Sequence, residues 1–102
     1  MAQVVVTYKT PKDPAAFDKY YYETHVPLVK AIPGLLKFEL STGPVVSAVG
    51  APGIHRIAIL HFADLATLGA GMESAEGKAA AADAAKFLGP DDSLTFFDTK
   101  EY

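Results

Sequence analysis

The residues best suited to chemistry are His25 and Tyr21, which lie four positions apart. Imidazole accepts and donates protons near neutral pH, and residues four apart share one side of a helix. A phenol and an imidazole placed in this way can both reach a carbonyl or enol group, which indicates proton transfer on a small substrate. The alternative is structural, because a histidine at a helix end beside proline can hydrogen bond helix carbonyls instead.

The other two histidines give weaker signals. His61 follows the apolar positions Ile57 and Ile59 at strand spacing, where a hydrogen-bonded structural role is the alternative to a role in binding. His55 stands at the start of the same run, where we expect it to be exposed to solvent. Without cysteine, and without two histidines at the spacing of metal ligands, the sequence predicts no metal site. One histidine can ligate haem, but no attachment motif is present, so we predict no cofactor.

Composition limits the classes of function. The chain has 102 residues, of which 50% are hydrophobic and 21% charged, and this predicts one domain spanning residues 1–102. The formal net charge of −3, without runs of like charge, argues against nucleic-acid binding. No apolar stretch approaches the roughly 20 residues of a membrane-spanning helix. The absence of cysteine and of a signal-peptide pattern before the first strand leads us to expect a cytoplasmic protein.

The elements that must position these residues follow from apolar periodicity and turn residues. We expect strands at residues 3–10, 35–42, 54–63 and 93–99. We expect helices from Asp13 to about Ile32, from Asp64 to Ala70 and from Ser74 to Leu88, with Asp13, Asp64 and Ser74 as N-caps. Pro27 should bend or interrupt the first helix. Because proline disfavours helical geometry in the preceding residue, we expect the break at Val26, with a short second turn that runs to Ile32.

The resulting order, βαββαβ, is that of a ferredoxin-like α+β fold with a four-stranded antiparallel sheet and both helices on one face. The first strand is apolar in both phases at Val4, Val5 and Val6, and so is the third strand around Ile59. An antiparallel sheet with one solvated face alternates instead. A second copy of the same sheet is the simplest cover for the other face, which predicts a homodimer. The alternative is that short apolar strands break alternation without consequence.

The stretch FDKYYYETHVPL at residues 17–28 resembles the motif of the EthD family, in which an aromatic helix ends in His-x-Pro-Leu. Further similarities follow in the same order along nearly the whole chain. They comprise Pro33-Gly34-Leu35, His55-Arg56-Ile57-Ala58 with Phe62, Ser74-Ala75-Glu76-Gly77, Asp83, Phe87 and Phe96-Phe97. One difference is His61, where members of the family often carry a large aromatic residue.

This resemblance implies a dimeric α+β barrel with a pocket between helix and sheet in each subunit. Within it we take His25 and Tyr21 as candidate catalytic residues, and Tyr8, Phe17, His61 and Phe62 as candidate substrate-binding residues. The family implies a small apolar or aromatic ligand and a part in the degradation of ethers, aromatics or polyketide-like compounds, as an enzyme or an accessory factor. The alternative is a non-catalytic binding protein that supports a monooxygenase system. Fold alone does not choose between them.

Overall fold

The computed structural model describes residues 1–102, and its elements follow one another in the predicted order. The strands are β1 (Ala2–Lys9), β2 (Lys37–Leu40), β3 (Ile54–Phe62) and β4 (Ser93–Asp98). The helices are α1 (Pro14–Tyr20), α2 (Val26–Lys30), α3 (Leu65–Glu73) and α4 (Ala75–Ala84), and a π-helical turn at Tyr21–His25 joins α1 to α2. None of these helices combines the length and the apolar character needed to cross a membrane.

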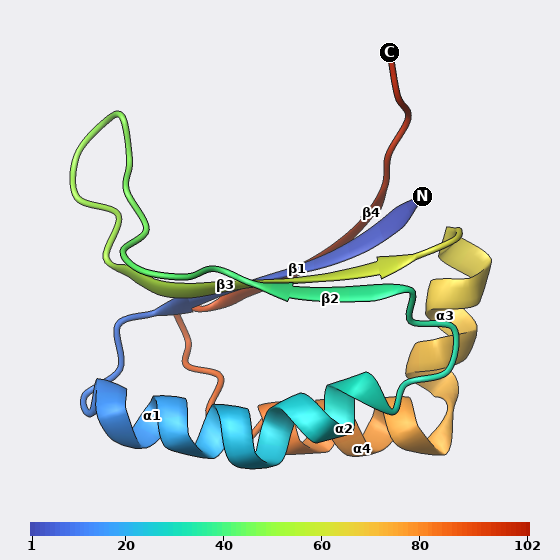
Figure 1. The fold of residues 1–102 in the computed structure, drawn as a ribbon, viewed down its shortest axis with the longest axis horizontal. Helices are drawn as coiled ribbons and strands as arrows, with labels where there is room; N and C mark the ends of the chain where they lie inside the picture. Colours follow the sequence, from blue (N-terminus) through green and yellow to red (C-terminus); the bar gives the residue numbers. More distant parts are fainter.

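The four strands form one antiparallel sheet in the order β2-β3-β1-β4. The helices cover a single face of this sheet, with α1, α2 and α4 forming a layer beneath it and α3 standing at one end (Figure 1). This arrangement confirms the predicted ferredoxin-like α+β fold.

The side chains of β1 divide between the two faces of the sheet. Val4, Val6 and Tyr8 are buried against the helices, whereas Val5 lies on the outer face and is only partly buried. On the neighbouring strand β3, Ile59 pairs with Val5 and therefore also lies on the outer face. On the outer side, the loop at residues 41–53 and the C-terminal residues 99–102 rise from opposite ends of the sheet (Figure 1).

The three predicted N-caps are confirmed. Asp13 and Asp64 accept hydrogen bonds from the backbone N–H groups of Ala16 and Thr67, three positions after each cap, at 3.1 Å and 2.7 Å. Ser74 Oγ accepts one from the N–H of Gly77 at 3.0 Å, which starts α4 directly where α3 ends. Each such bond satisfies one of the donors that a helix leaves unpaired at its start.

The predicted break of the helix at Val26 is wrong, because the helix continues through this residue. Val26 keeps helical torsion angles (φ −54°, ψ −47°), and its N–H donates to the carbonyl of Tyr21, five residues back. Pro27 has no N–H and its ring crowds the preceding turn of a regular helix. A wider turn relieves this crowding, so the chain passes through Pro27 as one continuous helix instead of breaking.

The end of α4 also differs from the prediction, since the helix stops at Ala84 rather than Leu88. Beyond it, the N–H groups of Lys86 and Phe87 donate to the carbonyls of Asp83 and Ala84, three residues back. Such bonds tighten the last turn. The tightened turn brings Phe87 into edge contact with His25, with ring centroids 4.9 Å apart.

Candidate functional site

A cavity of about 230 Å³ lies between the sheet and the helices. Of its sixteen lining residues fifteen are hydrophobic, and the remaining one is His25. Strand β1 contributes Val4, Val6 and Tyr8, and the π-helical turn contributes Tyr21 together with His25. The cavity therefore places one titratable imidazole in apolar surroundings, as ligand sites typically do with their few polar groups.

The opposite wall of the cavity is formed by four alanines of α4 and the turn that follows it, Ala80, Ala81, Ala84 and Ala85. Ala80 and Ala84 are buried, whereas Ala81 and Ala85 are exposed. Leu94 of β4 also lines the cavity and is 41% exposed. The exposed members of the lining thus place the opening between α4 and β4.

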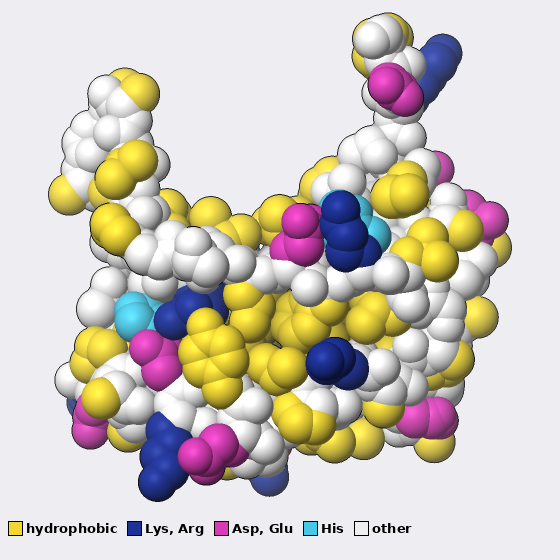
Figure 2. Space-filling view, in the orientation of Figure 1, with side chains coloured by type: hydrophobic (Ala, Val, Ile, Leu, Met, Phe, Trp, Pro, Cys, Tyr) yellow, Lys and Arg dark blue, Asp and Glu magenta, His cyan; other side chains and the backbone are white.

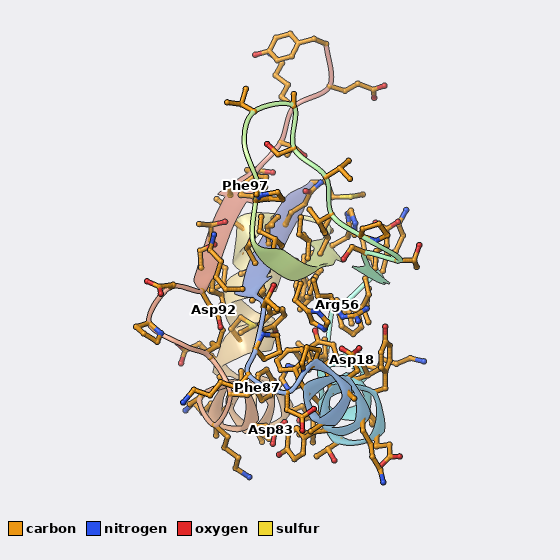
Figure 3. All side chains as sticks on the ribbon, turned by 90° about the vertical axis from the view of Figure 1, so that its left-hand side faces the viewer. Asp18, Arg56, Asp83, Phe87, Asp92 and Phe97 are labelled. Carbon is orange, nitrogen blue, oxygen red and sulfur yellow. The ribbon has the colours of Figure 1, made fainter.

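His25 is held by Asp83 of α4. The Nδ1 atom of the imidazole lies 2.9 Å from Asp83 Oδ2, and both residues are buried, with 4% and 5% exposure. The imidazole thus bonds to a carboxylate and not to a helix carbonyl. Asp83 and Phe87 both lie in the helical layer below the sheet (Figure 3), where the π-helical turn contacts α4.

The second oxygen of Asp83 is also occupied. The hydroxyl of Tyr20 donates to Asp83 Oδ1 at 2.5 Å, and Lys86 Nζ lies 3.7 Å from the same oxygen. Burial raises the pKa of Asp83, but the hydrogen bonds from Tyr20 and His25 outweigh it and lower the pKa below the usual 3.8. Asp83 is therefore an ionised carboxylate at neutral pH.

Because an ionised carboxylate only accepts hydrogen bonds, the proton of this pair must lie on Nδ1 of His25. Burial lowers the pKa of His25 below its usual 6.5, although Asp83 opposes the shift. The imidazole is then neutral at pH 7, with its remaining lone pair on Nε2. A partner that fixes one ring nitrogen in this way defines the role of the other, and here Nε2 is left as a base.

The cavity lining also contains two tyrosines, Tyr8 and Tyr21. Burial raises the pKa of Tyr8 to about 12, and burial likewise raises that of Tyr21 well above its ordinary value. Both phenols therefore stay protonated. Their rings meet edge to face with centroids 5.4 Å apart, and the ring of Tyr21 lies 5.1 Å from that of His25.

The remaining candidate residues are not brought together at this cavity. Phe17 packs on Tyr8, with ring centroids 5.5 Å apart, but belongs to the aromatic cluster beside the cavity. Phe62 is fully buried outside the cavity lining, against Gly34 and Gly71. His61 lies on the outer face of the sheet, where its Nε2 is 2.6 Å from Glu39 Oε1. Only Tyr8 among the predicted binding residues lines the cavity with His25.

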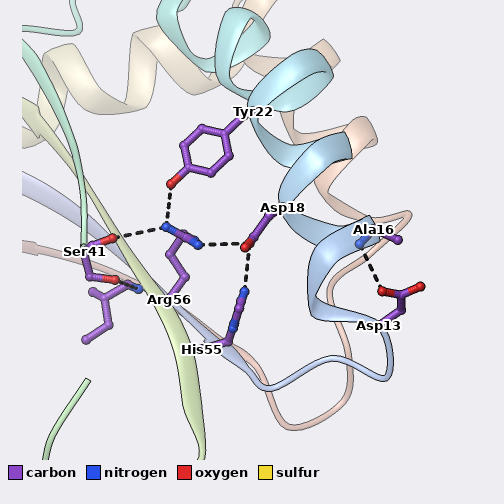
Figure 4. A network of polar contacts seen from close by, with 8 residues as sticks. Asp13, Ala16, Asp18, Tyr22, Ser41, His55 and Arg56 are labelled. Carbon is purple, nitrogen blue, oxygen red and sulfur yellow. Dashed lines mark hydrogen bonds and ion pairs between the residues drawn. The ribbon is translucent and has the colours of Figure 1, made fainter. Parts of the chain in front are cut away.

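A second polar cluster joins α1 to β3 outside the cavity (Figure 4). Asp18 Oδ1 lies 2.9 Å from Arg56 Nη2 and 2.8 Å from His55 Nε2, while Arg56 Nη1 donates to the hydroxyl of Tyr22. The expectation that His55 is exposed is wrong, since its side chain is 17% exposed and bonded to Asp18. These hydrogen bonds and the Asp18–Arg56 ion pair connect the first helix to the sheet.

A second groove, of about 400 Å³, lies between β2 on one side and the π-helical turn and α2 on the other. Figure 2 shows it as a hollow with hydrophobic side chains inside and lysines at its rim. Its polar lining consists of Lys30, Lys37 and the hydroxyl of Tyr22. Since it holds no histidine or carboxylate, the groove offers no proton acceptor comparable to His25.

Asp83 is the site residue that sequence reasoning did not assign. Its signal is a poor helix former in the middle of an alanine-rich helix, flanked by Ala82 and Ala84. Its distance of 58 residues from His25 along the chain left no spacing rule to connect them. No cluster of three or more histidine, aspartate or glutamate side chains with metal-binding geometry occurs in the structure.

The fold and the cavity define an α+β protein with a buried Asp–His pair facing an apolar space between sheet and helices. The sequence profile of the EthD domain matches residues 9–91, and the chain belongs to the EthD family. It is 39% identical over 99 residues to an uncharacterized 11.0 kDa protein of Rhodococcus erythropolis from the thcB-thcC intergenic region, covering 96% of this chain and 94% of that protein.

Solved structures agree with this assignment. The chain is similar to the crystal structure of an ethyl tert-butyl ether degradation (EthD) family protein from Bacillus halodurans, with a TM-score of 0.88 and 32% identity over 98% of this chain and 99% of that one. A cofactor-independent oxygenase of Streptomyces nogalater, SnoaB, has a TM-score of 0.68 at 13% identity, covering 99% and 94% of the two chains. At that identity the likeness concerns the fold alone.

Proposed function

We propose that the protein binds a small, mainly apolar molecule in the cavity and that His25 accepts a proton from it. The observation that carries this proposal is the neutral imidazole with its tautomer fixed by Asp83, the one polar side chain in an otherwise apolar lining apart from the two tyrosine hydroxyls. A base in an apolar cavity, with two protonated phenols in the same lining, is equipped for general base catalysis.

The comparisons support a part in the breakdown of small organic compounds. The similar protein from Bacillus halodurans carries the name of ethyl tert-butyl ether degradation. We extend from this to ethers, aromatics or polyketide-like compounds as the substrate class. A protein that binds such compounds without changing them, in support of a monooxygenase, is the alternative outcome of the test below.

The test is proton exchange on a probe ketone. Wild-type protein is incubated with 1-indanone in D2O, and loss of the protons next to the carbonyl is followed by NMR. His25→Asn is the informative variant, because its amide nitrogen can replace Nδ1 as donor to Asp83 while the base at Nε2 is lost. General bases contribute about 10²- to 10⁴-fold, so we expect exchange to fall by at least about 100-fold.

His55→Ala is the matched control, since His55 is a partly buried histidine outside the cavity. It should exchange the probe at the wild-type rate. Equal rates in wild type and His25→Asn would remove His25 from the mechanism. Binding of the probe without any exchange in the wild type would favour the non-catalytic role.

We also propose that the outer face of the sheet pairs with a second copy of the chain. Val5, Ile57 and Ile59 lie side by side on this face, and Phe97 of β4 is 39% exposed beside them. The two projections formed by residues 41–53 and 99–102 leave this face open between them (Figure 2). A self-complementary two-fold contact would cover it.

A further inference from the structure

Toward a ligand in the cavity, His25 can only accept a hydrogen bond. Nδ1 is committed to Asp83, so Nε2 offers only a lone pair to whatever occupies the cavity. Among side-chain nitrogen and oxygen atoms shielded from solvent, Arg56 Nε is the single one without a hydrogen-bond partner. Nε2 of His25 has no protein partner either and is therefore not shielded from solvent, and His25 is one of the residues that line the cavity.

The charges around the cavity exclude an anionic occupant. No lysine, arginine, aspartate or glutamate lines it. The charge bonded to the imidazole is the carboxylate of Asp83, which is negative. Lys86 approaches Asp83 from outside, with its side chain 71% exposed. A carboxylate placed in the cavity would thus lose its hydration without gaining a counter-charge, which is strongly unfavourable.

The size of the cavity favours a compact occupant. At about 230 Å³ it is smaller than the range of about 300–1,000 Å³ that is typical for drug-sized ligands. On the α4 side the lining includes the methyl groups of Ala80, Ala81, Ala84 and Ala85, and the rings of Tyr8 and Tyr21 belong to the same lining. Such a space suits a single ring with small substituents.

We infer, on the basis of the proposed function, that the natural ligand presents a neutral hydroxyl group, that of a phenol or an enol, to Nε2 of His25. The hydroxyl donates to the lone pair, and the rest of the ligand fills the apolar space. A compound of the same shape without the hydroxyl leaves Nε2 unpaired, and a carboxylate of the same shape leaves its charge unpaired.

The experiment compares p-cresol with p-xylene, which differ by a hydroxyl in place of a methyl group. Dissociation constants are measured at pH 8 by NMR titration of wild-type protein and of the double variant His25→Phe/Asp83→Leu. Removing both partners of a buried polar pair avoids leaving either one unsatisfied. We expect the affinity ratio of p-cresol to p-xylene to be at least about tenfold higher in the wild type, which corresponds to about 1.4 kcal/mol.

An unchanged ratio in the double variant would overturn the inference while leaving the apolar binding site intact. Failure of both compounds to bind the wild type would overturn the proposed function as well. Binding of 4-methylbenzoate as tight as that of p-cresol would overturn the requirement for a neutral ligand. Should the double variant not fold, the ¹⁵N resonance of His25 Nε2 in the wild type decides: it must shift with p-cresol and not with p-xylene.

Discussion

At the scale of single residues, Asp83 holds the site together because both of its oxygens are engaged. Tyr20 donates to one oxygen and His25 to the other. The two donors share one negative charge, so the strength of one bond depends on the presence of the other. Tyr20 is thus a positioning residue that acts on His25 through Asp83, although it does not line the cavity.

Tyr20→Phe should therefore raise the pKa of His25. Without the phenol, more of the negative charge of Asp83 is available to stabilise the imidazolium. The pKa can be measured by NMR titration of the His25 ring signals. Tyr22→Phe is the control, since the Tyr22 hydroxyl bonds to Arg56 and not to Asp83. An equal shift in both variants would show that the effect does not pass through Asp83.

Stability should fall with acid in a way that His25 explains. Burial lowers the pKa of folded His25 below 6.5, so the unfolded chain takes up a proton first as the pH falls through about 6.5. The free energy of unfolding then decreases with falling pH. Asp83, whose pKa is also lowered, adds a second decrease below about pH 4. Urea unfolding of His25→Asn between pH 7 and pH 5 should show a smaller decrease than the wild type, and an equal decrease would contradict this assignment.

The residues of the site were predicted as far as local spacing allows. Tyr21 and His25 share a helix face, and that spacing survives in the π-helical turn. The role of Asp83 could not be predicted from the sequence, because its contact with His25 depends on how α4 packs on the first helix. His61 was placed on the correct strand and in phase with Ile57 and Ile59, but the sequence did not indicate which face of the sheet carries the cavity.

At the scale of elements, the junction of α3 and α4 depends on glycine. A Cβ atom on Gly77 would collide with the backbone carbonyl of Gly71, whereas one on Gly69 would meet nothing within 4 Å. Ser74 caps α4 at this point, so α4 can start beside the end of α3 only if residue 77 has no side chain. Because α4 carries Asp83, the junction sets the position of the carboxylate.

Gly77→Ala and Gly69→Ala should therefore have effects of opposite sign. The first forces two backbone segments apart, and crowding of this kind costs about 1–3 kcal/mol. The second replaces glycine by alanine inside α3 without a clash and should stabilise by about 0.5–1 kcal/mol. Urea unfolding measures both changes. A Gly77→Ala protein as stable as Gly69→Ala would show that the junction tolerates a wider spacing.

The elements themselves were predictable because their caps and periods are local features. Strand starts, the three N-caps and the order of elements follow from neighbouring residues. The π-helical turn at Tyr21–His25 was not predictable. The following proline, Pro27, can either end a helix or be accommodated by a wider turn, and the packing of Tyr21 and His25 against the core favours the second solution.

At the scale of the whole molecule, the two faces of the sheet give different roles to neighbouring valines. Val6 is 6% exposed and points to the helices, where it lines the cavity. Val5 points to the outer face, beside Ile59 of β3 and Thr95 of β4. The sequence predicted that both faces need cover, and the structure assigns each valine to its face.

Val5→Asp and Val6→Asp form a matched pair that tests the proposed homodimer. An aspartate at position 6 would bury an unpaired carboxylate in the core, which is too costly to keep the fold, so we expect an unfolded chain by circular dichroism. At position 5 the carboxylate remains hydrated in a monomer and is unfavourable only in the dimer. Light scattering should therefore find a dimer for the wild type at micromolar concentration and a folded monomer for Val5→Asp. A monomeric wild type would refute the dimer, and a dimeric Val5→Asp would show that two copies meet through another surface.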